Sequence, residues 1–394
     1  MYNRAEAIDN NFQEYVLKGQ LPSSHSSIDL GSSSLKSEEL LDIFETQIMS
    51  RLIDLRAREM KQTNHCYYTI GSSGHEGNAV LGKVFRKNDM AFLHYRSGAF
   101  FIQRAKQHHG SSPLYDMILS LTASKEDPIS GGRHKVIGSK DLFIPPQTST
   151  IASHLPKAVG AALSIGKASD LKIESKMDRD SLILCSFGDA SANHSTAIGA
   201  INTACWVSYQ NMKLPLIFVC EDNGLGISTK TPQGWISQSF STRPELAYVH
   251  CDGLNVIDVY EKSKAAERYA RQRKKPVFLH MRTVRLMGHA GSDVETNYHS
   301  LDYVENTERQ DPLLHTAKIV LEHKLLSSKD ILDLYKVTRE KIKAISEEAV
   351  TRKPLSKISD VASTITSCEN KKAQPPLPKD CLLYTSPSPR DGLL

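Results

Sequence analysis

Two short, continuous apolar runs in the middle of the chain each end at turn-forming residues. Residues 182–187 are followed by Gly-Asp, and residues 214–220 are followed by Glu-Asp-Asn-Gly. Runs of this length and composition are typical of strands covered on both faces of a parallel sheet. Residues 190–210, rich in Ala, Ser and Asn, lie between the runs and predict a crossover helix. The whole segment therefore predicts a βαβ unit.

The same reading extends along most of the chain. Residues 37–62 open with a polar cap and acids and then repeat apolar residues every three or four positions, which predicts a long helix. Further apolar runs predict strands at residues 89–94, 254–257 and 276–281. Helices are expected at residues 157–167 and 262–273, with a last helical region at 311–351. This alternation predicts an α/β fold, a mostly parallel sheet with helices on both faces.

Composition excludes several classes of protein. The 394 residues are 40% hydrophobic and 24% charged, and the net charge of +5 is small for this length. Lys and Arg are scattered, so we expect no nucleic-acid partner. Seven Cys without a Cys-x-x-Cys pair indicate a reducing compartment and no zinc site. The N-terminus has no signal-peptide pattern and no apolar run approaches a membrane span, so we expect a cytoplasmic location and no membrane partner.

Asp189 and Asn223 each follow one of the two central strands. Parallel strands present their carboxyl ends at one edge of the sheet, where open α/β sheets bind ligands, so we expect the two side chains to lie together. Carboxylate and amide oxygens suit Mg²⁺, and the flanking glycines let the backbone carbonyl of Leu225 serve as a third ligand. Gly-Asp and Asn-Gly are also ordinary turn pairs, and either alone would favour a plain turn. Both together, each after a buried strand, favour a metal site.

The segments 188–193 (Gly-Asp-Ala-Ser-Ala-Asn) and 221–228 (Glu-Asp-Asn-Gly-Leu-Gly-Ile-Ser) resemble the thiamine diphosphate motif. More narrowly, they resemble the α subunit of the decarboxylating component of 2-oxo acid dehydrogenase complexes. The resemblance covers about residues 35–351 and implies a thiamine diphosphate-binding fold that holds the Mg²⁺ and diphosphate half of the site. It implies Mg²⁺ at Asp189, Asn223 and Leu225, with cofactor contacts from Gly188, Asp189, Ala190, Ser191, Asn223 and Leu225.

Two features depart from that family pattern. Ala190 stands where the family usually has Gly, and Asp189 and Asn223 are 34 positions apart, several more than is typical. Alanine is a mild change at a turn when φ stays negative. Neither departure removes a ligand.

Two further motifs of the same family are implied at the diphosphate. Tyr95-Arg96-Ser97-Gly98 resembles its Tyr-Arg motif, and Arg is the side chain best matched to phosphate, although a lone Arg after a strand is usually a surface residue. The segment 288–293 resembles the active-site loop, which implies that His289 contacts the diphosphate side and the reacting centre as a catalytic residue. Ala290 stands where animal relatives carry a phosphorylated Ser, so that control is not available at this position.

The resemblance also implies contacts to the ring and the substrate. Ser149 and Ile151 fall where the family cradles the aminopyrimidine. Tyr68 lies in the glycine-rich stretch 67–77 and is implied near the substrate, with a flexible connector as the alternative. His154 is expected near the cofactor and substrate, or is a packing histidine. The loops around Tyr68, Ser149 and His289 look closer to the branched-chain type, which favours 3-methyl-2-oxobutanoate as substrate.

The ends of the chain have different compositions. Residues 1–34 include a Ser-rich stretch and are expected to form a loosely attached extension with a short helix. Residues 352–379, rich in Lys, Ser and Pro, are linker-like. Residues 380–394 look like a non-native tail and are excluded from fold reasoning.

One catalytic group of the family is not found in this sequence. The cofactor needs an acid beside its pyrimidine nitrogen, and in two-subunit dehydrogenases this Glu lies on the β partner. We therefore expect an α part that works with a β subunit or a fused β half, and with the lipoyl acyltransferase component. The alternatives are a pyruvate or acetoin dehydrogenase α subunit, a transketolase-like half, or a degenerate regulatory subunit. The retained Arg96, Asp189, Asn223 and His289 argue against the last.

Overall fold

The computed structural model describes residues 3–23, 28–67 and 69–364. The chain divides into two compact units, Met1–Pro354 and Leu355–Leu394. In the second unit the described residues include one short helix, α13 (Ile358–Ala362). Tyr68, the predicted tail at 380–394 and residues 365–379 of the linker-like segment lie outside the described residues.

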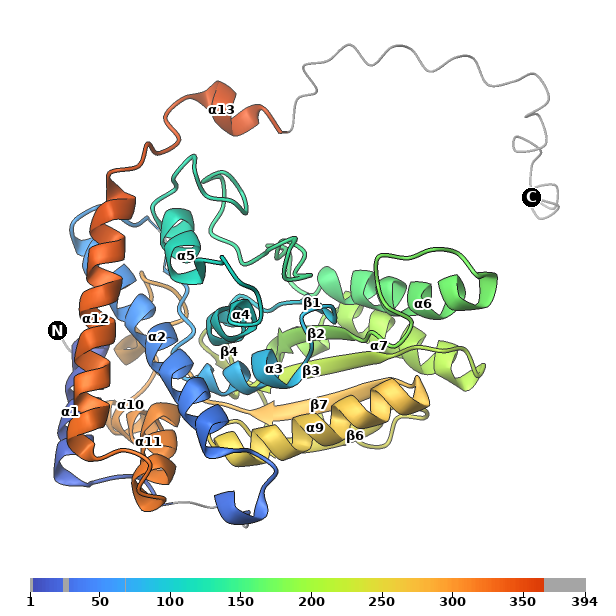
Figure 1. The fold of residues 1–394 in the computed structure, drawn as a ribbon, viewed down its shortest axis with the longest axis horizontal. Helices are drawn as coiled ribbons and strands as arrows, with labels where there is room; N and C mark the ends of the chain where they lie inside the picture. Colours follow the sequence, from blue (N-terminus) through green and yellow to red (C-terminus); the bar gives the residue numbers. More distant parts are fainter. Residues whose placement is uncertain (1–2, 24–27, 68, 365–394) are drawn as a thin grey trace. The chain divides into compact units, whose positions relative to one another are not determined.

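A five-stranded parallel sheet forms the centre of the first unit (Figure 1). Its strand order is β1 (Met90–Phe92), β2 (Ile183–Gly188), β3 (Leu216–Asp222), β7 (Val277–Arg282) and β6 (Ala247–Asp252). Gly188 at the end of β2 lies opposite Glu221 of β3, so these two strands end at the same level. The predicted strands at 89–94, 182–187, 214–220 and 276–281 are therefore confirmed, within a few residues at their ends.

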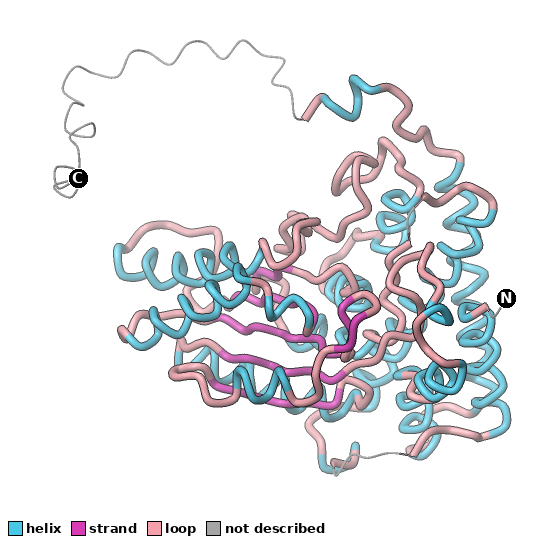
Figure 2. The backbone as a smooth tube through the Cα atoms, turned by 180° about the vertical axis from the view of Figure 1, so that it is seen from behind, coloured by secondary structure: helices cyan, strands magenta, loops and turns pink. Residues whose placement is uncertain are grey.

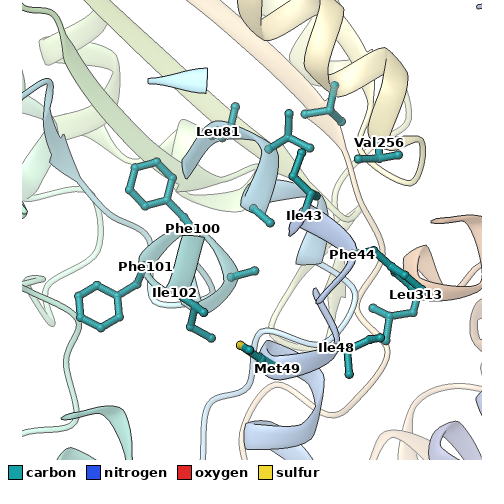
Figure 3. Packing of buried hydrophobic residues seen from close by; sticks show 14 of the residues in the cluster. Ile43, Phe44, Ile48, Met49, Leu81, Phe100, Phe101, Ile102, Val256 and Leu313 are labelled. Carbon is teal, nitrogen blue, oxygen red and sulfur yellow. The ribbon is translucent and has the colours of Figure 1, made fainter. Parts of the chain in front are cut away.

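Neighbouring residues of the strands enter two different cores. In β3, Ile217 and Val219 belong to one core, while Phe218 and Cys220 belong to the other. The first core is shared with α2 (Ser37–Gln62), α3 (Ala79–Val84), α4 (Gly98–Ala105), α9 (Val256–Arg273) and α11 (Pro312–Glu322), as Figure 3 shows in close view. The second core is shared with α6 (His154–Leu171), α7 (Ser195–Tyr209) and α8 (Trp235–Phe240). Helices thus cover both faces, as the tube of Figure 2 also shows, and the predicted α/β fold is confirmed.

The helices agree with most of the predicted ranges. The expected long helix is α2 (Ser37–Gln62), and α6 (His154–Leu171) begins three residues before the predicted range. The predicted crossover helix is divided into a 3₁₀ turn, η3 (Ala190–Asn193), and α7 (Ser195–Tyr209), with the extended His194 between them. The other helices of this unit are α1 (Arg4–Lys18), α3 (Ala79–Val84), α4 (Gly98–Ala105), α5 (Pro113–Leu121), α8 (Trp235–Phe240), α9 (Val256–Arg273), α10 (Leu301–Glu308), α11 (Pro312–Glu322) and α12 (Ser328–Val350).

The predicted strand at residues 254–257 is wrong. Asn255 caps helix α9, because its side-chain oxygen accepts the backbone N–H groups of Ile257 (2.9 Å) and Asp258 (3.1 Å). This cap starts the helix at Val256, within the apolar run that suggested a strand. The sheet instead takes its edge strand from β6, whose residues are mostly half-buried and therefore lack a continuous apolar run.

The expectation that the N-terminal extension is loosely attached is also wrong. Helix α1 buries Ile8, Phe12 and Val16, and the rings of Phe12 and Tyr335 lie 4.7 Å apart. Arg4 of α1 forms ion pairs with Glu295 and Glu308. Figure 1 shows α1 running beside α12 (Ser328–Val350). The first helix is therefore part of the main core.

We expect Phe12→Ala to lower the free energy of unfolding by about 3–5 kcal/mol, because the substitution leaves a cavity in a fully buried site. Urea unfolding of the full chain measures this value. Leu17→Ala on the same helix is the control, since Leu17 is 69% exposed and should change stability by less than about 0.5 kcal/mol. Equal, small effects of the two substitutions would contradict the packing of α1.

Candidate functional site

The level ends of β2 and β3 bring Asp189 and Asn223 to the same edge of the sheet. The Asp189 side chain is buried, and its carboxylate accepts hydrogen bonds from the Thr231 hydroxyl and from the backbone of Asn223. The two residues that the sequence placed together as a pair of oxygen donors are therefore neighbours in the structure.

Asp189 carries a charge that its surroundings do not balance. Burial raises the pKa of its carboxyl to about 6, and the nearby Asp222 adds to the rise. In the described part of the chain, no Lys, Arg or His lies within ion-pair distance of this carboxylate. A buried carboxylate in this position favours a bound cation, which removes the penalty of its ionisation.

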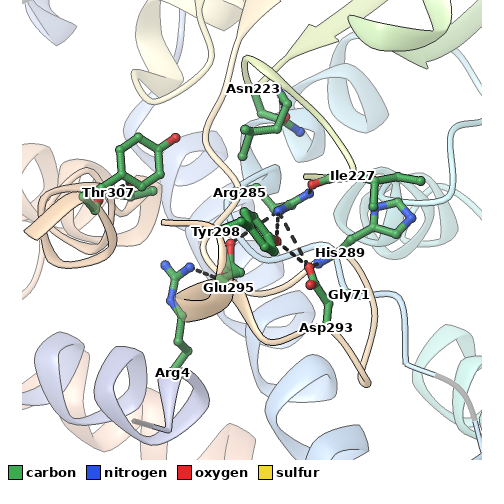
Figure 4. A network of polar contacts seen from close by, with 12 residues as sticks. Arg4, Gly71, Asn223, Ile227, Arg285, His289, Asp293, Glu295, Tyr298 and Thr307 are labelled. Atoms are coloured by element: carbon green, nitrogen blue, oxygen red, sulfur yellow. Dashed lines mark hydrogen bonds and ion pairs between the residues drawn. The ribbon is translucent and has the colours of Figure 1, made fainter. Parts of the chain in front are cut away.

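Asn223 leads into a tight hairpin formed by β4 (Leu225–Gly226) and β5 (Thr229–Lys230). Its Oδ1 accepts the Leu225 backbone N–H at 3.0 Å. At the tip of the hairpin, Ile227 has φ 59°, a left-handed conformation that strains a β-branched residue. The buried Arg285 donates to the Ile227 carbonyl at 2.7 Å, which holds the strained turn (Figure 4). The hairpin thereby fixes the backbone of Leu225 beside Asn223.

The structure explains how the chain accommodates Ala190. A Cβ placed on Gly226 would lie 2.7 Å from the Cβ of Ala190. The methyl group of Ala190, which a glycine at this position would lack, therefore occupies the space that a side chain at position 226 would need.

Arg96 is the second buried charge at this edge. Its guanidinium donates to the carbonyl oxygens of Gly71 (2.6 Å) and His289 (3.1 Å). Among the described residues no carboxylate forms an ion pair with it, and burial lowers its pKa. A buried guanidinium whose hydrogen bonds go to carbonyls and a histidine, with no carboxylate among them, is suited to bind an anion, and its planar group of donors matches phosphate.

His289 lies against Arg96, with its Nδ1 3.3 Å from the Arg96 Nη2. Its backbone N–H donates to Asp293 at 2.6 Å, which holds the loop in place (Figure 4). Burial, together with the positive charges of Arg96 and Arg285, lowers the pKa of His289 to about 4. The imidazole is therefore neutral at pH 7, and its Nδ1 can accept a hydrogen bond from the guanidinium.

A cavity of about 110 Å³ lies beside this edge. The predicted residues that line it are Tyr95, Ser149, Ile151, His154 and Ser191. His154 fits both of its readings: its Nε2 donates to the Ser186 carbonyl at 2.8 Å, as a packing histidine does, and its ring also lines the cavity. The described residues that were predicted for the ring and for the substrate thus lie together, and Tyr68 lies outside the described residues.

Several residues at this edge were not singled out by the sequence. His94 and Lys135 line the cavity, and Arg285 holds the hairpin. His75 contacts Glu221, 146 positions further along the chain, with their Nδ1 and Oε2 atoms 2.7 Å apart. The glycine-rich loop that contains His75 was the available signal, but its partner is set by the fold alone.

Comparisons with known proteins agree with this geometry. Residues 44–358 match the family described as "Dehydrogenase E1 component". A 2-oxoisovalerate dehydrogenase subunit alpha of Bacillus subtilis is 28% identical over 327 residues, which cover 80% of this chain and 90% of the relative. The mitochondrial subunit of the same name in Mus musculus is 25% identical over 321 residues, 80% of this chain and 68% of the relative. The mitochondrial pyruvate dehydrogenase E1 component subunit alpha-1 of Arabidopsis thaliana is 26% identical over 317 residues, covering 78% and 75%.

We expect Asp189→Asn to stabilise the metal-free chain at pH 7.5 by about 1–3 kcal/mol. The folded chain holds the Asp189 proton more tightly than the unfolded chain, so this stabilising contribution is lost as the pH rises through about 6. The neutral amide has no such loss. Urea unfolding in EDTA at pH 7.5 and pH 4.5 measures it, and the difference from the native chain should shrink at the lower pH.

The exposed Asp141→Asn serves as the control and should leave stability unchanged at both pH values. An Asp189→Asn chain that is no more stable than the native one at pH 7.5 would contradict an uncompensated buried charge.

Proposed function

Because the chain belongs to the dehydrogenase E1 component family, we propose that it is the α part of its enzyme and holds the Mg²⁺ and diphosphate end of the cofactor. Members of this family are 2-oxo acid dehydrogenases that use thiamine diphosphate. The proposed reaction is the oxidative decarboxylation of a 2-oxo acid, with transfer of the acyl group to a lipoyl group.

The pair of uncompensated buried charges carries this proposal. Asp189 lacks a cation and Arg96 lacks an anion among the described residues, and both lie at the same edge of the sheet. Magnesium diphosphate would supply both missing partners, the cation to the carboxylate and the anion to the guanidinium. No ligand of only one sign would balance the two sites.

The proposed metal ligands are the side-chain oxygens of Asp189 and Asn223 and the backbone carbonyl of Leu225. All three are hard oxygen donors, which favours Mg²⁺ over a softer transition metal. The raised pKa of Asp189 supports the assignment, because a cation at the carboxylate stabilises its ionised form.

The remaining cofactor contacts follow the shape of the edge. Tyr95, Arg96 and His289 are proposed at the diphosphate, with Gly188, Ala190 and Ser191 beside the metal. Ser149 and Ile151 are proposed at the aminopyrimidine, where both line the cavity. His154 and Tyr68 are proposed near the substrate.

Thiamine diphosphate, when bound, supplies the electron-accepting group that decarboxylation of a 2-oxo acid needs. This chain's residues provide position and charge around it. Arg96 binds the anionic end, and the neutral imidazole of His289 offers a hydrogen-bonding nitrogen beside it. With a pKa of about 4, His289 holds no extra proton at pH 7, so its proposed catalytic part is hydrogen bonding.

The proposed partners are a β subunit or a fused β half and the lipoyl acyltransferase component. The relatives that match are named as alpha subunits, which supports a divided enzyme. Every helix in the described part of the chain is too short or too polar to cross a bilayer. The cytoplasmic location stays a prediction, since two of the relatives are named as mitochondrial.

For the substrate, we expect a higher kcat/KM for 3-methyl-2-oxobutanoate than for pyruvate. Two of the relatives named above act, by their names, on 2-oxoisovalerate and one on pyruvate, so the comparisons leave both open. One methylene in an apolar pocket changes binding by only about 1–3 kcal/mol, so the preference should be modest, roughly 10–200-fold. Steady-state kinetics of the complete enzyme measure it, and a clear preference for pyruvate would place the chain in the second candidate function, a pyruvate dehydrogenase α part.

Because the site is proposed to be shared with a β part, we expect residues 1–355 alone to show almost no decarboxylation. The acid beside the pyrimidine nitrogen is expected on the β part, and a positioned proton-transfer group contributes about 10²–10⁴-fold. An assay with an artificial electron acceptor at saturating Mg²⁺ and thiamine diphosphate, with and without a β-type subunit, measures the gain. Full turnover by the α part alone would contradict the proposal that this chain holds only half of the active site.

A further inference from the structure

A chain of buried side chains lies behind the proposed metal ligand Asn223. Glu221, His75 and Asn78 are fully or almost fully buried. They connect the end of strand β3 to the glycine-rich loop before α3. The proposed function assigns none of these three side chains a role. Their hydrogen bonds decide which way the amide of Asn223 faces.

The chain of hydrogen bonds begins at Asn78, whose amide orientation is set by the main chain. Its Oδ1 accepts the backbone N–H of Phe100 at 2.8 Å, and its Nδ2 donates to the backbone carbonyl of Arg96 at 3.1 Å. A backbone N–H can only donate and a carbonyl can only accept, so the reverse orientation of the amide would leave both contacts unfavourable.

Glu221 is the next residue in this chain of hydrogen bonds. The Nδ2 of Asn78 also donates to the Glu221 Oε2 at 3.2 Å. The same oxygen lies 2.7 Å from the His75 Nδ1. The Glu221 carboxylate can only accept, so in this short contact His75 carries its proton on Nδ1 and donates it to Glu221.

The other ring nitrogen of His75 connects this chain of hydrogen bonds to Asn223. Its Nε2 lies 3.0 Å from the side-chain nitrogen of Asn223. A neutral imidazole with its proton on Nδ1 presents Nε2 as an acceptor. Asn223 therefore points its NH₂ group at His75 and its Oδ1 away from it.

The backbone of Leu225 favours the same orientation of the Asn223 amide. The Oδ1 of Asn223 accepts the Leu225 backbone N–H at 3.0 Å, which again requires the oxygen on that side. A doubly protonated His75 would donate from Nε2 and would conflict with this contact. Both ends of the chain of hydrogen bonds, the backbone at Phe100 and the backbone at Leu225, therefore agree on one arrangement.

His75 and Glu221, with the neighbouring His94, also have the spacing of a metal site. Ligand atoms of His75, His94 and Glu221 lie within 4.8 Å of one another, which is a spacing that metal ligands show. However, both nitrogens of His75 are engaged, one with Glu221 and one with Asn223. A metal there would have to break the hydrogen bonds that orient Asn223.

We infer that His75 is a positioning residue that turns the amide oxygen of Asn223 toward the metal, with Glu221 fixing the tautomer of His75. The inference rests on the proposed function, because it concerns the same Mg²⁺ site. An asparagine amide can face either way, and only its oxygen can bind a cation. Without the His75 acceptor, the Leu225 N–H alone favours this orientation, so a larger part of the population presents NH₂ to the metal and binding of Mg²⁺ weakens.

Two substitutions separate the two nitrogens of His75. In His75→Asn the side-chain NH₂ replaces Nδ1 and keeps the contact with Glu221, but nothing replaces Nε2. In His75→Gln the side-chain oxygen takes the place of Nε2 and keeps the acceptor for Asn223. The measurement is the Mg²⁺ concentration that gives half of the thermal stabilisation of the full chain by millimolar thiamine diphosphate, which needs no catalysis.

We expect His75→Asn to raise this Mg²⁺ concentration by about 10–100-fold, the usual effect of removing a residue that orients a metal ligand. His75→Gln should stay within about 3-fold of the native value, although it removes a donor from the buried Glu221 and should melt at a lower temperature. A purely structural role would link the two readouts, so that the variant with the lower melting temperature also bound Mg²⁺ more weakly.

The Asn223→Asp background supplies a further control. A carboxylate presents oxygen whichever way it turns, so His75→Asn should cause less than about a 3-fold additional change there. A His75→Asn chain with native Mg²⁺ dependence, equal losses in both His75 variants, or an undiminished effect in the Asn223→Asp background would each overturn the inference. A native chain without any Mg²⁺-dependent stabilisation by thiamine diphosphate would instead overturn the proposed function.

Discussion

The pairing of β2 with β3 is the constraint on which the site depends. Six residue pairs place Gly188 opposite Glu221, so the residues that follow the two strands emerge at the same level. A shift by one residue would exchange the two cores, moving Phe218 out of the core of α6 and α7 and Ile217 into it. Because both faces of the sheet are buried, this register is strongly specified, and with it the distance between Asp189 and Asn223.

That rigid edge supports two charges that work against stability. Asp189 and Arg96 are buried, and within the described residues neither has an ion-pair partner of opposite sign. Such groups are more often found where a protein binds a ligand than where it only packs, since folding alone gains nothing from them. The hydrogen bonds from Thr231 to Asp189, and from Arg96 to the carbonyls of Gly71 and His289, reduce the cost of burying them without removing it.

The strained hairpin beside the metal site is held from a distance. Arg285 donates to the Ile227 carbonyl and also pairs with Glu295, which in turn pairs with Arg4 on helix α1 (Figure 4). The N-terminal helix, which composition suggested was a loose extension, thus stabilises the residue that holds Ile227 at positive φ. Strain of this kind persists only where the surroundings over-determine it.

The sequence by itself determined the features that are local in the chain. The central strands, the long helix α2 and the turn residues Asp189 and Asn223 were predicted because apolar runs, helical periodicity and turn chemistry act over a few neighbouring residues. The tertiary structure decided what depends on contacts between distant segments: the packing of α1, the choice of β6 as edge strand, and the partner of His75. His75 meets Glu221 across 146 positions, and no local pattern encodes that contact because only the tertiary fold brings the glycine-rich loop against strand β3.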